Sequence, residues 1–197
     1  ARSRPRRARA PRARGRDSHE EHRVATPLEL LFDLFFVVAI ALAAAQLHHG
    51  VMGHHAGSAL AGFLAAFMAI WWAWMNYSWF ASAYDNDDAV FRLLTMVQMA
   101  GVLIFSTGIA GIFKGEFTTG VVGYAVMRLG LVGLWLRAAR DDPARRVTCL
   151  RYAFGIAAIQ VLWIARLWAP AEWTWPGFVV LMAVELALPM WAERPAP

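Results

Sequence analysis

The feature that most constrains the fold is a nearly continuous apolar run from Thr26 to Gln46. A helix of about 20 residues, at about 1.5 Å each, crosses the hydrocarbon core of a bilayer. Two acids near the start of this run, Glu29 and Asp33, are four positions apart and so share one face of a helix. A carboxylate at the centre of a membrane helix costs roughly 2.5–3.5 kcal/mol on insertion scales. Both acids therefore need a partner, a proton or water.

The rest of the chain repeats this apolar pattern. Of its 197 residues 59% are hydrophobic, whereas soluble domains contain about half or less. Six apolar segments of near-spanning length are separated by charges, Gly or Pro: residues 27–47, 58–82, 91–113, 118–137, 148–168 and 174–191. In lipid every backbone polar group has to be satisfied within its own segment. We therefore predict an all-α fold, a polytopic transmembrane bundle of six helices over residues 26–192.

Arginines predict how the chain sits in the membrane. Eight of them fall within residues 1–16, and the loop between the fourth and fifth segments carries Arg137, Arg140, Arg145 and Arg146. With six crossings both stretches lie on one side, and Arg in short loops favours the cytoplasmic side. We predict that both termini are cytoplasmic and that residues 1–25 form a disordered tail in contact with anionic lipid headgroups. This distribution argues against a nucleic-acid partner, and residues 193–197 form the C-terminal end.

The first predicted helix has a clear start. Thr26 is a good N-cap, Pro27 suits the first helical position, and Glu29 completes a Thr-x-x-Glu capping box. The box gives Glu29 a purely structural role. Asp33 lies one turn deeper, beyond the free amides of the helix start. Its structural alternative is an ion pair with an Arg of another helix.

Further polar side chains fall at or below mid-membrane when depth is counted from the predicted cytoplasmic ends. They lie in the same half as Asp33 and are Asn76, Arg92, Gln98, Arg128 and Glu185, with Gln160 as the exception. Such segregation predicts a buried polar cluster or a vestibule open to the cytoplasm. Arg128 is too deep to reach water, so we expect a carboxylate partner for it.

The third predicted helix follows an acidic turn. We expect Asp85 or Asn86 to cap it and Asp88, four residues before Arg92, to favour its positive N-terminal end. We include Asp88 in the candidate intramembrane cluster. Arg92 has the alternative of extending its side chain to the interface.

Four histidines, His48, His49, His54 and His55, follow the first apolar run. Imidazole pairs can bind zinc or copper, but no Cys or acid in this loop completes a site. We expect an exposed, weakly pH-responsive loop rather than a metal site, and no cofactor. The chain has no phosphate-binding loop, Cys-x-x-Cys or nucleophile elbow, so enzyme catalysis has little support.

Three strings resemble the low-temperature-requirement protein A family of bacterial membrane proteins: RVATPLELLFDLFFVVAIA, WWAWMNYSWFASAYDNDDAVFRLLTMVQMAGVLIFS and ELALPMWAER. The resemblance implies an integral, multi-pass protein of the bacterial inner membrane that is linked by its family name to growth in the cold. Members are typically longer, with a second half of similar helical character. The chain thus resembles an N-terminal half, for which self-association or a missing second half is the expected partner.

A second likeness covers one helix. The stretch from Phe32 to Phe36 is similar to the Phe-Ser-Asp start of the pore-lining first helix in two-repeat potassium channels, although the Ser is missing here. It implies a place for Asp33 along an ion path.

Three functional hypotheses follow. The first is a transporter or channel for a small ion or solute, because intramembrane ionisable residues mark such paths. The alternative is a structural or sensory membrane protein whose buried ion pairs only fix helix packing. A further alternative is a membrane-embedded lipid-modifying enzyme that uses the carboxylates for acid–base chemistry.

Overall fold

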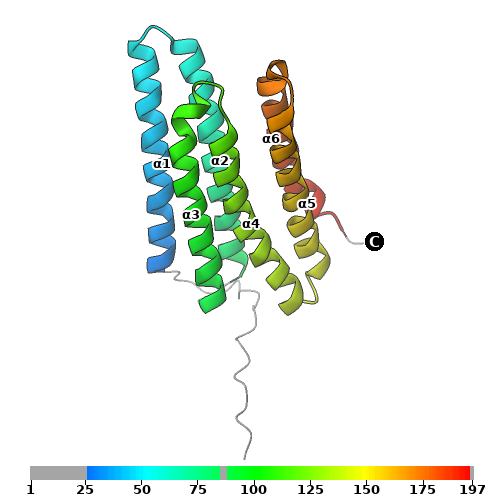
Figure 1. Ribbon diagram of the computed structural model, residues 1–197. Helices are drawn as coiled ribbons and strands as arrows, with labels where there is room; N and C mark the ends of the chain where they lie inside the picture. Colours follow the sequence, from blue (N-terminus) through cyan, green and yellow to red (C-terminus); the bar gives the residue numbers. More distant parts are fainter. Residues whose placement is uncertain (1–25, 85–87, 196–197) are drawn as a thin grey trace, which may run out of the picture.

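The computed structural model describes residues 26–84 and 88–195, and every regular element in these ranges is helical. The six α-helices are α1 (Pro27–Met52), α2 (Ala56–Ala83), α3 (Ala89–Ile112), α4 (Thr118–Asp141), α5 (Arg146–Ala165) and α6 (Thr174–Ala192) (Figure 1). Two 3₁₀ turns, η1 (Arg166–Trp168) and η2 (Ala171–Trp173), connect α5 to α6. Each α-helical span is long and apolar enough to cross a membrane. The predicted all-α bundle is confirmed, whereas the predicted tail, residues 1–25, lies outside the described residues.

Helix starts follow the local sequence. The Thr26 hydroxyl accepts a hydrogen bond from the Glu29 amide at 3.2 Å, and the Glu29 carboxylate accepts one from the Thr26 amide at 3.2 Å, so the predicted capping box is present. Asp88 is the N-cap of α3, with its carboxylate 2.9 Å from the Phe91 amide. Our expectation of a cap at Asp85 or Asn86 falls on residues outside the described ranges, and the observed cap replaces it.

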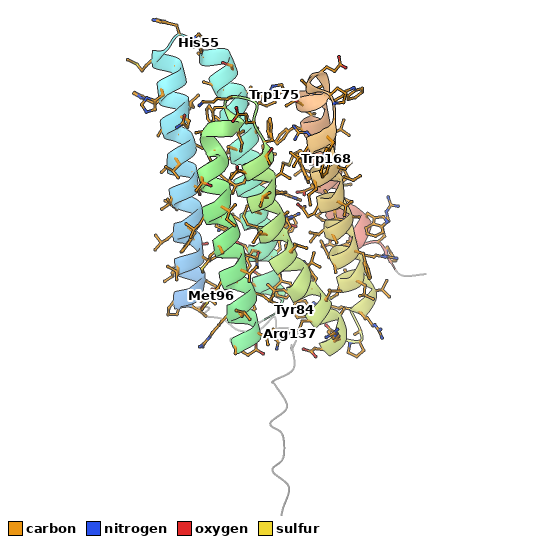
Figure 2. All side chains as sticks on the ribbon, viewed as in Figure 1. His55, Tyr84, Met96, Arg137, Trp168 and Trp175 are labelled. Carbon is orange, nitrogen blue, oxygen red and sulfur yellow. The ribbon has the colours of Figure 1, made fainter. Side chains whose placement is uncertain are left out.

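The helices form two groups that share α4 (Figure 1). α1 packs on α2 and α3, α3 packs along α4, and the α5–α6 hairpin packs on the other side of α4. α2 also contacts α4. Figure 2 places Tyr84 and Arg137 at one end of the bundle and His55 and Trp175 at the other.

Glycines bring α3 and α4 into close contact. A Cβ added to Gly101 would lie 2.5 Å from the Met127 amide nitrogen, and one added to Gly108 would lie 2.6 Å from that of Gly120. Both neighbours are backbone atoms of α4, which a side chain cannot displace. Small residues at such positions let membrane helices approach closely. This contact fixes α4, and with it the side chains that α4 directs towards α5 and α6.

Candidate functional site

The carboxylate of Glu185 on α6 is completely buried, with an exposed fraction of 0%. One of its oxygens, Oε2, accepts hydrogen bonds from the Tyr124 hydroxyl and from Arg128 Nη2 at 3.3 Å. The other, Oε1, accepts from Gln160 Nε2 and Trp163 Nε1, each at 3.1 Å. We call these five side chains the Glu185 network. Glu185 is the carboxylate partner that we expected for Arg128 from its predicted depth in the membrane.

Helical spacing explains how the Glu185 network forms. Tyr124 and Arg128 are four apart on α4, whereas Gln160 and Trp163 are three apart on α5, so each helix presents one pair on a single face. The Arg128 guanidinium also lies 5.5 Å from the centre of the Tyr124 ring. A buried carboxylate is stable only with hydrogen-bond or ion-pair partners, and here α4 and α5 supply them to Glu185.

The Glu185 network retains unused hydrogen-bonding capacity. Among the described residues, the buried Nε and Nη1 of Arg128 and the buried Oε1 of Gln160 have no hydrogen-bond partner. Pro189, one helical turn after Glu185, has no N–H to donate to the Glu185 carbonyl. Buried polar groups normally have partners, so these three atoms are unsatisfied in the dry interior of the bundle.

A cavity of about 520 Å³ lies one turn from Glu185. We call it the polar cavity, and its lining includes Asn76, Tyr84, Trp135, Arg145, Tyr152 and Pro189. These residues come from α2, α4, α5 and α6 and from their adjoining loops. The cavity reaches the end of the bundle at which Figure 2 places Tyr84. Since Pro189 lines it, its inner end is about 6 Å from the level of Glu185 along α6.

The opposite side of the Glu185 network is dry and aromatic. Trp163 packs on Phe178 with ring centres 5.4 Å apart, and Phe117 packs on Trp175 at 5.6 Å and on Phe178 at 6.1 Å. We call these four residues the aromatic layer. The void beside it, also lined by Tyr124, has a volume of only about 20 Å³. The bundle is therefore hollow on one side of Glu185 and closed on the other.

Asp33 and Glu29 lie elsewhere, in a groove of about 250 Å³ between α1 and α2. Asp33 is exposed, and its Oδ1 accepts a hydrogen bond from Trp74 Nε1 at 2.7 Å. Tyr77 and two serines of α2, Ser78 and Ser82, complete most of the groove wall. No residue of this groove belongs to the Glu185 network, so the structure does not bring Asp33 and Arg128 together.

The other predicted cluster residues occupy further places. Asn76 lines the polar cavity, and its side-chain amide donates to the Trp72 carbonyl at 2.8 Å. Gln98 is buried between α3 and α4, close enough that a Cβ on Gly130 would meet its Cγ at 2.6 Å. Arg92 is exposed in the first turn of α3.

Asp88 pairs with an arginine that the sequence reasoning did not select. Arg137 Nη1 donates to Asp88 Oδ1 at 2.6 Å, and Nη2 donates to Oδ2. This hydrogen-bonded guanidinium holds the pKa of Asp88 below its ordinary value. Arg137 Nε is also 3.7 Å from the Asp141 carboxylate. The pair ties the start of α3 to the end of α4 at the bundle end where Figure 2 labels Arg137.

The four histidines divide between a helix and a turn. α1 continues to Met52, so His48 and His49 belong to it and only His54 and His55 lie between α1 and α2. All four are exposed, and the His48 and His49 rings are 6.0 Å apart. In the ranges 26–84 and 88–195 no three His, Cys, Asp or Glu side chains group in a way that could hold a metal ion.

Six membrane-length helices around a buried ion pair define a polytopic integral membrane protein. The model of one family, described as bacterial low temperature requirement A protein (LtrA), matches residues 24–196, and the chain belongs to this family. The sequence resemblance is thereby confirmed. Comparison with curated proteins and with solved structures finds no match.

Proposed function

We propose that this protein transports a small ion or solute through the space between α2 and the α5–α6 hairpin. The observation that carries the proposal is the asymmetry about Glu185, with the polar cavity on one side and the aromatic layer on the other. A transporter in a conformation open to one side of the membrane needs this arrangement, since its substrate site has to be accessible from that side and closed from the other. Intramembrane ionisable residues mark such paths by default.

The Arg128–Glu185 ion pair is the gate in this proposal. A proton on Glu185 removes its charge and weakens its hold on Arg128, because charge-assisted hydrogen bonds are roughly twice as strong as neutral ones. The α4 and α5 contacts to α6 then loosen together, since they meet at one carboxylate. Pro189 lies one turn away, where a missing backbone hydrogen bond makes bending easier.

The proposal moves the path away from the one predicted at Asp33. That residue stays a candidate in the groove between α1 and α2, where it faces Trp74 rather than an arginine. Location in the bacterial inner membrane and cytoplasmic placement of both termini belong to the same proposal. Their support is the arginine distribution along the chain.

The test is a flux assay with the full chain in sealed proteoliposomes. An entrapped pH dye follows proton movement while gradients of potassium, benzoate or choline are imposed in turn. We expect at least one gradient to drive flux above that of empty liposomes, and Glu185→Gln to abolish it. Glu172→Gln, in the exposed η2 turn, is the matched control and should behave as the unaltered chain.

Two results would contradict the proposal. One is the absence of flux with every gradient, and the other is unchanged flux in a folded Glu185→Gln protein. Because Glu185→Gln leaves Arg128 without its counter-charge, the double variant Glu185→Gln with Arg128→Gln is assayed in parallel. It removes both buried charges, so its fold does not depend on the pair.

A second candidate is a purely structural protein in which the Glu185 network locks helix packing. The observation in its favour is the dryness of the ion pair, with side-chain exposures of 1% for Arg128 and 0% for Glu185. Under this alternative the double variant regains stability and no gradient drives flux. The flux assay therefore separates the two candidates.

A further inference from the structure

Arg166 lies where three helices meet, at the end of the bundle away from the polar cavity. It follows α5 directly and begins η1. Its Nη2 donates a hydrogen bond to the carbonyl of Thr174, the first residue of α6, and Figure 2 labels the next residue, Trp175, at this end. The guanidinium lies 4.5 Å from the ring centre of Phe117, the N-cap of α4. One side chain therefore connects α4, α5 and α6.

The same guanidinium contacts two rings of the aromatic layer. Besides Phe117, it lies 5.5 Å from the ring centre of Trp163. A cation over the face of an aromatic ring is attracted by the ring's quadrupole, and more strongly where water is excluded. Both rings also line the small dry void, whose lining includes Tyr124 of the Glu185 network. Arg166 thus holds together two rings of the layer that closes the bundle on this side of Glu185.

The position of Arg166 is one that the side chain can leave without breaking an ion pair. Among the described residues no carboxylate pairs with it, whereas Arg128 has Glu185 as its counter-charge. Its buried Nε also has no hydrogen-bond partner in the described part of the chain. A buried donor without a partner costs free energy, and the cost disappears when the side chain turns into water. Release of Arg166 therefore recovers part of what its contacts contribute.

A second arginine makes the same kind of contact at the other end of the α5–α6 hairpin. Arg151 Nη1 donates to the Arg194 carbonyl at 2.6 Å and lies 3.5 Å from the Ala192 carbonyl oxygen, so it ties α5 to the end of α6. Neither of these partners belongs to the aromatic layer. Arg151 is thus a matched control, because it shares the backbone contact of Arg166 but not the rings.

We propose that Arg166 is the latch of the aromatic layer, and that its release from Phe117 and Trp163 opens the dry void at the end of the bundle where α6 begins. The polar cavity already approaches Glu185 from the other end. Release of the latch gives the Glu185 network access to the second side of the membrane, as alternating access requires. The part that the latch plays in transport rests on the proposed function, whereas its closure of the layer does not.

The test is thiol labelling of Ala65→Cys, which lines the dry void, in the full chain with Cys149→Ser. A membrane-impermeant maleimide is added to each side of sealed vesicles in turn. Arg166→Gln should raise the labelling rate about tenfold from the side opposite to that which labels Asn76→Cys, because a cation–π contact and a hydrogen bond are lost. Arg166→Lys keeps the cation and a donor and should restore protection. Arg151→Gln should leave position 65 protected.

A second variant removes the ring and keeps the cation. Phe117→Leu retains an apolar side chain and should raise the labelling of position 65 from the same side as Arg166→Gln does. In the double variant the two effects should not add, because both changes break one contact. Asn76→Cys in each background should react no faster than before, since the latch is remote from the polar cavity. Monodisperse elution in detergent identifies the folded variants.

Two results overturn the latch. One is unchanged labelling of position 65 in a folded Arg166→Gln protein, and the other is faster labelling of positions 65 and 76 alike, which shows general loosening of the bundle. The expected labelling without flux under any gradient keeps the latch and removes the transport function. Flux under a gradient, with position 65 still protected in Arg166→Gln, keeps the transport function and removes the latch.

Discussion

Arg128 on α4 and Glu185 on α6 form an ion pair with an N–O distance of 3.3 Å, and neither side chain is more than 1% exposed. Fifty-seven positions separate them in the sequence. Each is costly to bury alone. The pair therefore couples the position of α6 to that of α4, with Tyr124 bound to the same carboxylate oxygen.

Arg128→Ala should lower the free energy of unfolding by about 3–5 kcal/mol, because it leaves Glu185 buried without its counter-charge. Adding Glu185→Gln should restore much of this loss. Thermal unfolding of the purified single and double variants measures both effects. If the double variant is no more stable than the single one, the ion pair is not the source of the loss.

Asp88→Asn should lower the free energy of unfolding by about 1–3 kcal/mol at pH 7, through loss of the charged hydrogen bonds to Arg137. Asn caps helices as well as Asp does, so the loss reports the pair and not the cap. Asp141→Asn is the control and should cost less, since its carboxylate is 3.7 Å from Arg137 Nε and is the more exposed of the two acids. Equal losses in the two variants would contradict this assignment.

The same pair predicts a direction for acid sensitivity. The folded-state pKa of Asp88 is lowered, so its stabilisation is complete above the unfolded value of about 3.9. It disappears as the pH falls through the lower, folded pKa. The difference in melting temperature between the unaltered chain and Asp88→Asn should therefore shrink below about pH 4. A difference that stays constant down to pH 2 would contradict it.

Gly108→Ala should destabilise the bundle by about 1–3 kcal/mol, because its Cβ would meet the Gly120 amide nitrogen at 2.6 Å. Gly57→Ala is the matched control, since a Cβ there meets nothing within 4 Å. It should be neutral or slightly stabilising. Melting temperatures of the two variants provide the comparison, and equal values would show that α3 and α4 are not held at their closest approach.

Asp33→Asn should leave gradient-driven flux within about twofold of the unaltered chain, because Asp33 lines a groove that shares no residue with the Glu185 network. The same proteoliposome assay measures it. Loss of flux in Asp33→Asn, together with unchanged flux in Glu185→Gln, would place the transport path at Asp33 on α1, as the sequence predicts.

The helices were predictable because apolar segments of membrane length leave few alternatives in lipid. The capping box at Thr26 was equally predictable, since all its atoms belong to one helical turn. Depth along each segment identified Arg128 as a residue in need of an acid. Depth does not tell which face of a helix a residue occupies, so the sequence placed the path at Asp33 and gave Glu185 only a place in the cluster.

Which side chains meet in the Glu185 network depends on how each helix is rotated about its own axis. Contacts between helices that are distant in the sequence set this rotation. Glycines place α3 against α4 at Gly101 and Gly108, which leaves Arg128 to meet α6. Tyr124 could have been found from its four-residue spacing to Arg128. Gln160 was seen as the one deep polar residue outside the predicted layer, and only the fold shows that it binds Glu185.

Thiol labelling of position 76 tests the central claim most directly, namely a path that is open on one side of Glu185 and sealed on the other. Asn76→Cys and Ala65→Cys are prepared in a Cys149→Ser background and treated with a membrane-impermeant reagent from each side of sealed vesicles. Asn76 lines the polar cavity, and Ala65 lines the dry void on the same helix. We predict that position 76 reacts from one side only and position 65 from neither. Reaction of both from both sides, or of neither from any side, would contradict the account.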